Sequence, residues 1–172
     1  MTDLVMADCA IRQLHARYID AVWRKDIDAF VDCFAEDAEW KIAGLHLKGH
    51  AEIRRAITRF LEPIDRIQMI FSTPILEVGQ GTASARTYVR EFNRARNGET
   101  ASTVGIYFER FVDHGDRWRF QWRQWMLQYI GPADLSAEPY ECKDFGPPPA
   151  MPGPEEPTVV RKSFLQQSPH DG

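Results

Sequence analysis

Hydrophobic residues in the first third of the chain recur every three or four positions, which is typical of amphipathic helices. The pattern predicts a helix over residues 8–24 with one buried face. Asp26 is a favoured N-cap residue and predicts a second, shorter helix directly after it. Residues 37–42 and 45–48 alternate as two short strands. A third helix is predicted over residues 50–62.

The hydrophobic period changes from 3.6 to 2 after the third helix and keeps that value for about seventy residues. This predicts strands over residues 66–78, with an interruption near Pro74, and over 82–96, 99–112 and 117–130. The predicted order is three helices around a small hairpin, followed by a four-stranded antiparallel meander. We therefore expect an α+β fold in which a curved sheet carries helices on one face.

The chain changes in composition after residue 130. Nine of the eleven prolines lie in residues 131–172, and such a segment does not form a compact core of its own. We therefore divide the chain into a domain over residues 1–130 and a C-terminal tail. The tail still contains apolar residues, so we expect it to run extended over the domain or over a neighbouring subunit; the alternative is a mobile tail. These residues are Tyr140, Phe145, Val159, Val160, Phe164 and Leu165.

Composition excludes several classes of function. The chain has 172 residues and a formal net charge of −4, so it lacks the basic excess of a nucleic-acid binder. It contains no apolar run of membrane-spanning length, and its N-terminus has no basic segment of the kind that begins a signal peptide. The three cysteines are scattered and read as reduced thiols. We expect a cytoplasmic protein without a membrane partner.

Several short motifs occur in a fixed order along residues 8–130. They are Arg17-Tyr18, Lys25-Asp26, Phe34-Ala35-Glu36-Asp37-Ala38, Gly49-x-x-x-Ile53, Tyr107-x-Glu109 and Trp118-x4-Arg123. In this order they resemble the nuclear transport factor two superfamily, and within it the SnoaL-type branch of polyketide cyclases, ketosteroid isomerases and dehydratases. The resemblance implies a cone-shaped roll, with a bent sheet wrapped around an apolar pocket, and chemistry without a cofactor.

The resemblance also assigns roles to particular positions. Tyr18 falls on the oxyanion-hole tyrosine of the steroid isomerases, and Tyr107 falls where those enzymes have a second hydrogen-bond donor. The isomerase base, however, is replaced by Ile42. Trp23 and Met69 stand where SnoaL-type relatives often keep an acid and a histidine. The chain should therefore not be a steroid isomerase.

Two further residues are candidates for proton transfer. Alternation places Glu109 on the same strand face as Tyr107, and a carboxyl in a dry pocket would have a raised pKa and act as acid or base. The alternative is an ion pair with Arg123 or Arg90. His15 lies one helical turn before Tyr18, and its alternative is a satisfied histidine in the core or at the rim. No metal-ligand spacing and no glycine-rich phosphate loop is present in the sequence.

Aromatic residues supply the predicted pocket walls, which suit aromatic or polycyclic ligands. The set is Trp23, Trp40, Phe60, Met69, Phe71, Tyr107, Phe120 and Trp122, and its alternative is plain core packing. The opposite sheet face would be apolar and exposed in a monomer, through Val104, Ile106, Phe108, Trp125 and Leu127. Such a face usually marks an interface, and the resemblance implies the same, so we expect a homodimer or homotrimer.

These features predict a cofactor-independent lyase, dehydratase or isomerase that acts on a hydrophobic aromatic small molecule. Tyr18 and Tyr107 would bind a phenolic or carbonyl oxygen, and Glu109 or His15 would move the proton. The pocket chemistry resembles that of the diarylpropane lyases of lignin-dimer breakdown, which release formaldehyde. Two alternatives stay open, namely a non-catalytic binding module and an assembly subunit of an oxygenase.

Overall fold

In a computed structural model of the chain, the described residues are 4–115, 117–148 and 150–160. Within them the chain forms three helices and seven strands. The helices are α1 (Leu4–Arg24), α2 (Ile27–Asp32) and α3 (Gly49–Leu61). The strands are β1 (Phe34–Ile42), β2 (Leu45–Lys48), β3 (Ile64–Phe71), β4 (Ile75–Val78), β5 (Thr82–Ala95), β6 (Thr100–Asp113) and β7 (Trp118–Gly131). None of the described helices is long and apolar enough to cross a membrane.

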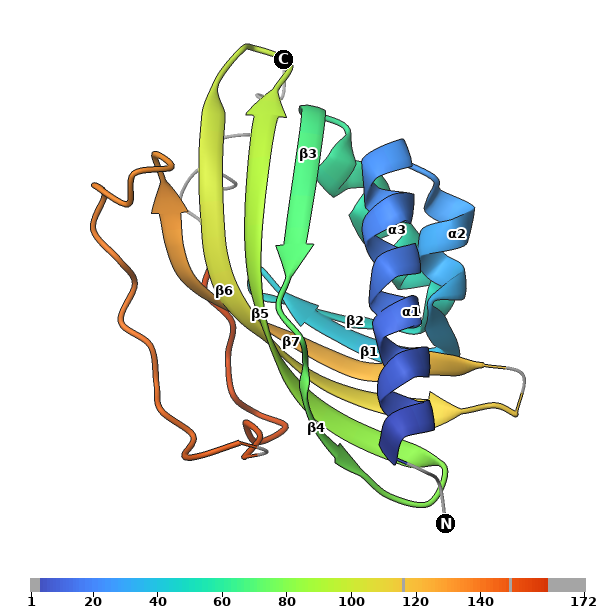
Figure 1. Cartoon of the computed structure of the whole chain (residues 1–172). Helices are drawn as coiled ribbons and strands as arrows, with labels where there is room; N and C mark the ends of the chain where they lie inside the picture. The colour runs from blue at the N-terminus through green and yellow to red at the C-terminus, as the bar shows by residue number, and fades with distance from the viewer. Residues whose placement is uncertain (1–3, 116, 149, 161–172) are drawn as a thin grey trace.

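Two local features of the sequence set the boundary between α1 and α2. The Asp26 carboxylate accepts a hydrogen bond from the Ala29 amide at 2.9 Å, which confirms it as the N-cap of α2. Lys25, between α1 and α2, has a left-handed backbone with φ of 55°, so the two helices separate there. This break lets α2 pack beside α1 on the same side of the sheet (Figure 1).

The sheet is strongly curved, and the helices cover its concave face (Figure 1). Its strand order is β2-β1-β7-β6-β5-β3, with β4 paired to β5. Every pair is antiparallel except β1 with β7, which is parallel and joins the first hairpin to the last strand. The expected α+β fold, with a curved, mostly antiparallel and unclosed sheet around N-terminal helices, is confirmed.

A β-bulge in β7 decides which face each of its residues occupies. Phe111 and Arg110 are consecutive on β6, yet they oppose Phe120 and Trp122, so β7 carries one extra residue between them. Phe120 consequently faces the helices, whereas Trp122 lies on the outer face. The predicted position of Trp122 in the pocket wall is therefore wrong, because simple alternation does not continue through a bulge.

The same shift corrects the opposite prediction for the later part of β7. Trp125 and Leu127 pair with Tyr107 and Gly105 and face the helices, where they are 3% and 2% exposed. They were expected on the outer face. Trp125 therefore belongs to the core, although simple alternation assigned it to the outer face.

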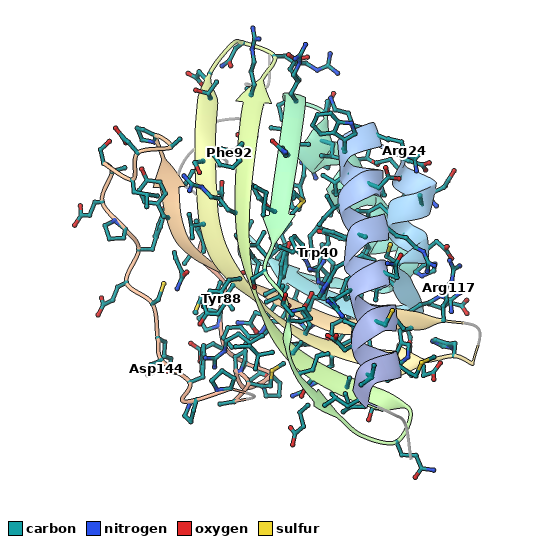
Figure 2. All side chains as sticks on the ribbon, viewed as in Figure 1. Arg24, Trp40, Tyr88, Phe92, Arg117 and Asp144 are labelled. Atoms are coloured by element: carbon teal, nitrogen blue, oxygen red, sulfur yellow. The ribbon has the colours of Figure 1, made fainter. Side chains whose placement is uncertain are left out.

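The tail covers the outer face of the sheet, on the side away from the helices (Figure 1). Figure 2 shows Trp40 between helices and sheet, and Asp144 on the far side, in the tail. The rings of Phe145 and Phe108 lie 5.3 Å apart, and Met151 packs on the same cluster. Ile106 and Phe108 are consequently 5% and 1% exposed, so the expectation that they are exposed in a single chain is wrong.

Charged side chains of the sheet hold the tail by its main chain. Arg86 donates to the carbonyl oxygens of Gly146 and Ala150, each at 3.0 Å. Lys41 donates to those of Pro154 and Glu156 at 2.7 and 2.6 Å. Polyproline-rich backbone leaves its carbonyls unpaired, so these contacts satisfy acceptors that the tail cannot satisfy itself. Phe164 and Leu165 lie outside the described residues. Self-association through the outer face stays a prediction and would involve the tail.

Candidate active site

A cavity of about 130 Å³ lies between the helices and the inner face of the sheet. Its wall is mostly apolar, and four residues bring polar side chains to it: Tyr18, Glu91, Asn93 and Tyr107. The remaining lining residues are Val22, Trp40, Ile42, Ala43, Ile57, Phe60, Leu61, Pro63, Ile64, Ile67, Met69 and Trp125. An apolar cavity with a few converging polar groups is the usual form of a small-molecule site.

The two tyrosines come from different layers and meet at the cavity. Tyr18 lies on α1 and Tyr107 on β6, and both line the cavity. Burial raises the pKa of Tyr18, opposed by the charge of Arg123, and burial together with the neighbouring Tyr18 raises the pKa of Tyr107 well above its ordinary value. Both phenols are therefore protonated at neutral pH and can donate a hydrogen bond.

The buried cation of Arg123 lies against the rings of both tyrosines. The guanidinium carbon of Arg123 lies 3.7 Å from the ring centre of Tyr107 and 4.4 Å from that of Tyr18. Its Nε donates to the Glu109 carboxylate at 2.9 Å. That carboxylate also accepts from the Thr87 hydroxyl at 2.6 Å and lies 3.0 Å from the His15 Nε2. The four polar residues form one network buried under the tyrosines.

The network corrects the prediction for Glu109. Burial by itself would raise the pKa of its carboxyl, but the charges of His15 and Arg123 outweigh burial and lower that pKa below its ordinary value. The expected raised pKa is therefore wrong. The alternative drawn from the sequence, an ion pair with Arg123, is present in the structure. Neither Glu109 nor His15 lines the cavity.

A model of the SnoaL-like domain matches residues 5–124, which is more than half of the chain. The chain belongs to the SnoaL-like domain family. The resemblance to the SnoaL-type branch of the nuclear transport factor two superfamily is thereby confirmed. No curated protein sequence matches the chain.

Solved structures show the same fold. A proposed aromatic ring hydroxylase from Novosphingobium aromaticivorans is 25% identical, with a TM-score of 0.70 over 76% of this chain and 95% of that one. A proposed scytalone dehydratase from the same organism is 18% identical, with a TM-score of 0.71 over 76% and 91% of the two chains. A hexachlorocyclohexane dehydrochlorinase of type 2 is 17% identical, with a TM-score of 0.67 over 84% and 96%.

The cavity of this SnoaL-like domain collects some of the predicted residues and not others. Five of them line it: Tyr18, Trp40, Phe60, Met69 and Tyr107. Phe71 and Phe120 lie behind the lining, with ring centres 5.9 and 5.7 Å from that of Tyr18. They support the tyrosine and do not form the wall.

Trp23 does not line this cavity, so its predicted place there is wrong. Tyr18 and Val22 are four residues apart and share the inner face of α1, but Trp23 is turned away by another 100° of helix. Its side chain is 60% exposed. It borders a separate hollow of about 400 Å³ that also includes Arg66, Phe92 and other residues of β3, β5 and β6.

The prediction also missed polar and aromatic residues that do line the cavity. Glu91 and Asn93 lie on β5, opposite Met69 and Ile67 in the ladder, and share the inward face with them. Period-two alternation over β5 would have identified both. Trp125 could not be found in that way, because the bulge precedes it. Among the described residues, no group of three His, Cys, Asp or Glu side chains could hold a metal ion.

Proposed function

We propose that this SnoaL-like domain is a cofactor-independent lyase, dehydratase or isomerase that uses acid–base chemistry on a small aromatic compound. The observation that carries the proposal is the pair of tyrosines, Tyr18 and Tyr107, at an apolar cavity that also contains one carboxylate, Glu91. Two donors and a base at one cavity are the parts that proton abstraction beside a carbonyl requires.

The volume and the walls of the cavity fit a substrate that inserts a single aromatic ring. Its volume of about 130 Å³ is close to that of cavities of ~150 Å³ that admit benzene. Trp40, Phe60 and Trp125 supply flat faces against which such a ring stacks. A diaryl compound of the kind that loses formaldehyde would place one ring here and the other outside the cavity.

The proposed steps follow from the groups around this ring. Tyr18 and Tyr107 donate hydrogen bonds to the carbonyl or phenolic oxygen, where negative charge grows as the reaction proceeds. With an aryl carbonyl compound, Glu91 takes a proton from the carbon beside the carbonyl, and the electron pair either expels a substituent on the next carbon or recovers the proton from Glu91 at a different carbon. With a phenol, Glu91 takes the hydroxyl proton, and the phenolate expels a substituent on the carbon attached to the ring. In both eliminations Glu91 passes the proton to the leaving group. The eliminations are lyase or dehydratase reactions, and recovery of the proton at a different carbon is an isomerisation.

The charge balance at the site limits the range of substrates further. Glu91 becomes neutral as the substrate oxygen becomes negative, so the total charge around the cavity does not change during proton transfer. A substrate that is already anionic would instead place a second negative charge beside the Glu91 carboxylate in a poorly solvated space. We therefore propose neutral phenols and aryl carbonyl compounds as substrates, with aromatic carboxylic acids excluded.

The comparisons support this class of reaction at the level of the family. Two of the similar structures carry names, scytalone dehydratase and dehydrochlorinase, that denote the elimination of a small group. Their identity to this chain is below 20%, so the likeness concerns the fold. The chemistry proposed for this chain rests on its own tyrosines and carboxylate.

The test is a screen followed by matched substitutions. The protein is incubated with neutral single-ring and diaryl compounds that carry a substituent able to leave, and products are followed by liquid chromatography and mass spectrometry. We expect turnover to fall about 10²–10³-fold in Tyr18→Phe or Tyr107→Phe, and about 10²–10⁴-fold in Glu91→Gln. Tyr88→Phe, which alters an exposed tyrosine of β5 outside the cavity, is the control and should retain full activity.

A specific outcome would contradict the proposal. If turnover of the best substrate survives in the double variant of Tyr18 and Tyr107, the tyrosine pair is not the reacting site. If ligands bind and no compound turns over, the domain is a binding module. The similarity to the β-subunit of a proposed aromatic-ring-hydroxylating dioxygenase from Novosphingobium aromaticivorans, at a TM-score of 0.65 and 17% identity, keeps an assembly role as the second candidate. Light scattering of the purified chain addresses that role.

A further inference from the structure

Arg123 is a fully buried cation that the proposed steps leave without a role. Its side chain is 0% exposed, and its guanidinium is enclosed by aromatic rings. The guanidinium carbon lies 3.7 Å from the ring centre of Tyr107, 4.1 Å from that of Phe120 and 4.4 Å from that of Tyr18. Because burial of a charge is costly, a cation in this place calls for a function or for a strong structural reason.

The fold fixes the position of this cation closely. Arg123 on β7 and Glu109 on β6 are direct partners in the ladder, so their side chains lie on the same face of the sheet. The carboxylate holds the guanidinium Nε at 2.9 Å and an Nη at 2.8 Å. Glu109 is held in turn by Thr87 and His15 from two other elements. The guanidinium therefore cannot leave the tyrosine rings without breaking this network.

We infer that Arg123 is a positioning residue that keeps a positive charge against the rings of Tyr18 and Tyr107, which makes their hydroxyls stronger donors toward a ligand oxygen. A cation on a ring face is attracted to the π electrons and stabilises negative charge that develops on the phenol oxygen. The inference rests on the proposed function only in that the ligand must present an oxygen to the tyrosines.

The other charged groups around the tyrosines act differently. Glu91, on β5, opposes the cation, because its carboxylate raises the pKa of both phenols. Cys33 is neutral, since burial raises the pKa of its thiol to about 11. His15 faces Glu109 and the ring of Phe71, not a phenol oxygen. Arg123 is the charge that lowers the pKa of both phenols against burial.

The test measures phenol acidity in the free protein, without any ligand. The residue 3,5-difluorotyrosine, whose phenol ionises far below the pH at which tyrosine does, replaces Tyr107, and its ionisation is followed by fluorine NMR. The label is placed in the wild-type background and in the variants Glu109→Gln, Glu109→Gln with Arg123→Met, and Arg110→Met. Arg110 is a matched control, because it lies on the outer face with its guanidinium carbon 5.2 Å from the ring centre of Trp122.

The two informative variants should move the acidity in opposite directions. Loss of both charges should decrease the acid dissociation constant of the labelled phenol roughly 10-fold or more, because an opposite charge at this distance is removed. Loss of Glu109 alone should increase that constant several-fold, because Arg123 is no longer neutralised. The control Arg110→Met should change it less than twofold.

Defined results would overturn the inference. A dissociation constant within twofold of wild type in both informative variants would show that Arg123 has only a structural role, and so would an equal response to Arg110→Met. If circular dichroism shows that the doubly substituted protein is unfolded, the Glu109→Gln arm decides alone. If no compound turns over in the substrate screen but the acidity changes as expected, the proposed function is contradicted and the role of Arg123 is supported. If turnover requires both tyrosines but the acidity does not change, the proposed function is supported and the role of Arg123 is contradicted.

Discussion

The variant Arg123→Met tests how much the buried network contributes to stability. Methionine retains most of the length of the side chain and can fill the space between the rings, but it removes the charge and the donor at 2.9 Å from Glu109. Glu109 then stays buried at 0% exposure with the hydrogen bonds from Thr87 and His15 and without its guanidinium partner. We therefore expect a large loss of folding free energy.

The magnitude follows from the burial of the pair. Removal of one partner of a buried ion pair costs about 3–5 kcal/mol, because the other charge is left uncompensated. A domain of this kind has a total stability of about 5–15 kcal/mol, so the variant should fold but unfold at much lower urea concentration. Addition of Glu109→Gln removes the uncompensated charge and should restore about 2–3 kcal/mol, since neutral replacement of both partners is often tolerated.

The pH dependence of stability should be weaker in Arg123→Met than in the wild type. In the wild type the pKa of Glu109 is lowered on folding, so its contribution is complete above the unfolded pKa of about 4.3 and is lost as the pH falls below that value. In Arg123→Met the charge of Arg123 no longer opposes burial, although His15 stays 3.0 Å from the carboxylate, so the pKa of Glu109 should lie above its value in the folded wild type. The variant then loses less stability than the wild type on acidification, and the gap between them should narrow as the pH falls from 7 to 4.

The assay is urea unfolding followed by tryptophan fluorescence at pH 7, 5.5 and 4, for the wild type, both single variants and the double variant. Two results would refute the reasoning. One is a loss below about 1 kcal/mol in Arg123→Met, which is the range of an exposed pair. The other is a double variant that is no more stable than Arg123→Met, because the uncompensated carboxylate would then not be the cause.

Three further predictions concern the frame around the site. Gly105→Ala places a methyl group 2.5 Å from the main-chain oxygen of the facing strand and 2.5 Å from the cavity tryptophan ring, so a loss of about 1–3 kcal/mol is expected by urea unfolding; Gly153→Ala, with open space around it, should be neutral. Phe145→Ala removes the ring that packs on the outer face, so binding of a hydrophobic dye should increase, and unchanged dye fluorescence would show that the tail does not cover that face. Asp26→Ala leaves an amide of α2 unpaired and should lower the melting temperature by more than Asp20→Ala, which alters an exposed helix pair; equal shifts would remove the capping role.

The order and type of the elements could be predicted because they follow local periodicity. The third helix was expected over residues 50–62 and spans Gly49–Leu61, and the strand expected over 82–96 spans Thr82–Ala95. A helix or strand needs only that its own residues place apolar side chains on one face. Capping chemistry at Asp26 is local in the same sense, so the start of α2 was predicted to the residue.

The predicted positions of individual side chains were wrong where contacts between residues far apart in the chain decide them. The bulge opposite Arg110 and Phe111 moved Trp122 out of the pocket and Trp125 into it, and no signal in β7 alone reveals it. Trp23 was assigned by its correspondence with relatives, although helical phase turns it away from Tyr18. Glu91 was missed although alternation places it inward like Glu109, and only the structure shows that Glu91 lines the cavity while Glu109 pairs with Arg123.

The sequence by itself determined the α+β fold and the element order, because these depend on local periodicity. Its ordered motifs showed the resemblance to SnoaL-like domains, and that resemblance pointed to Tyr18 and Tyr107 as candidate site residues. Only the tertiary structure decided that the Glu91 carboxylate lines the cavity, whereas the Glu109 carboxylate forms an ion pair with Arg123. It also decided that Arg123 stands behind the tyrosine rings and that the tail covers the outer face. Each of these depends on partners far apart in the chain, and the charge state and exposure of a residue are properties of such partners rather than of the residue type.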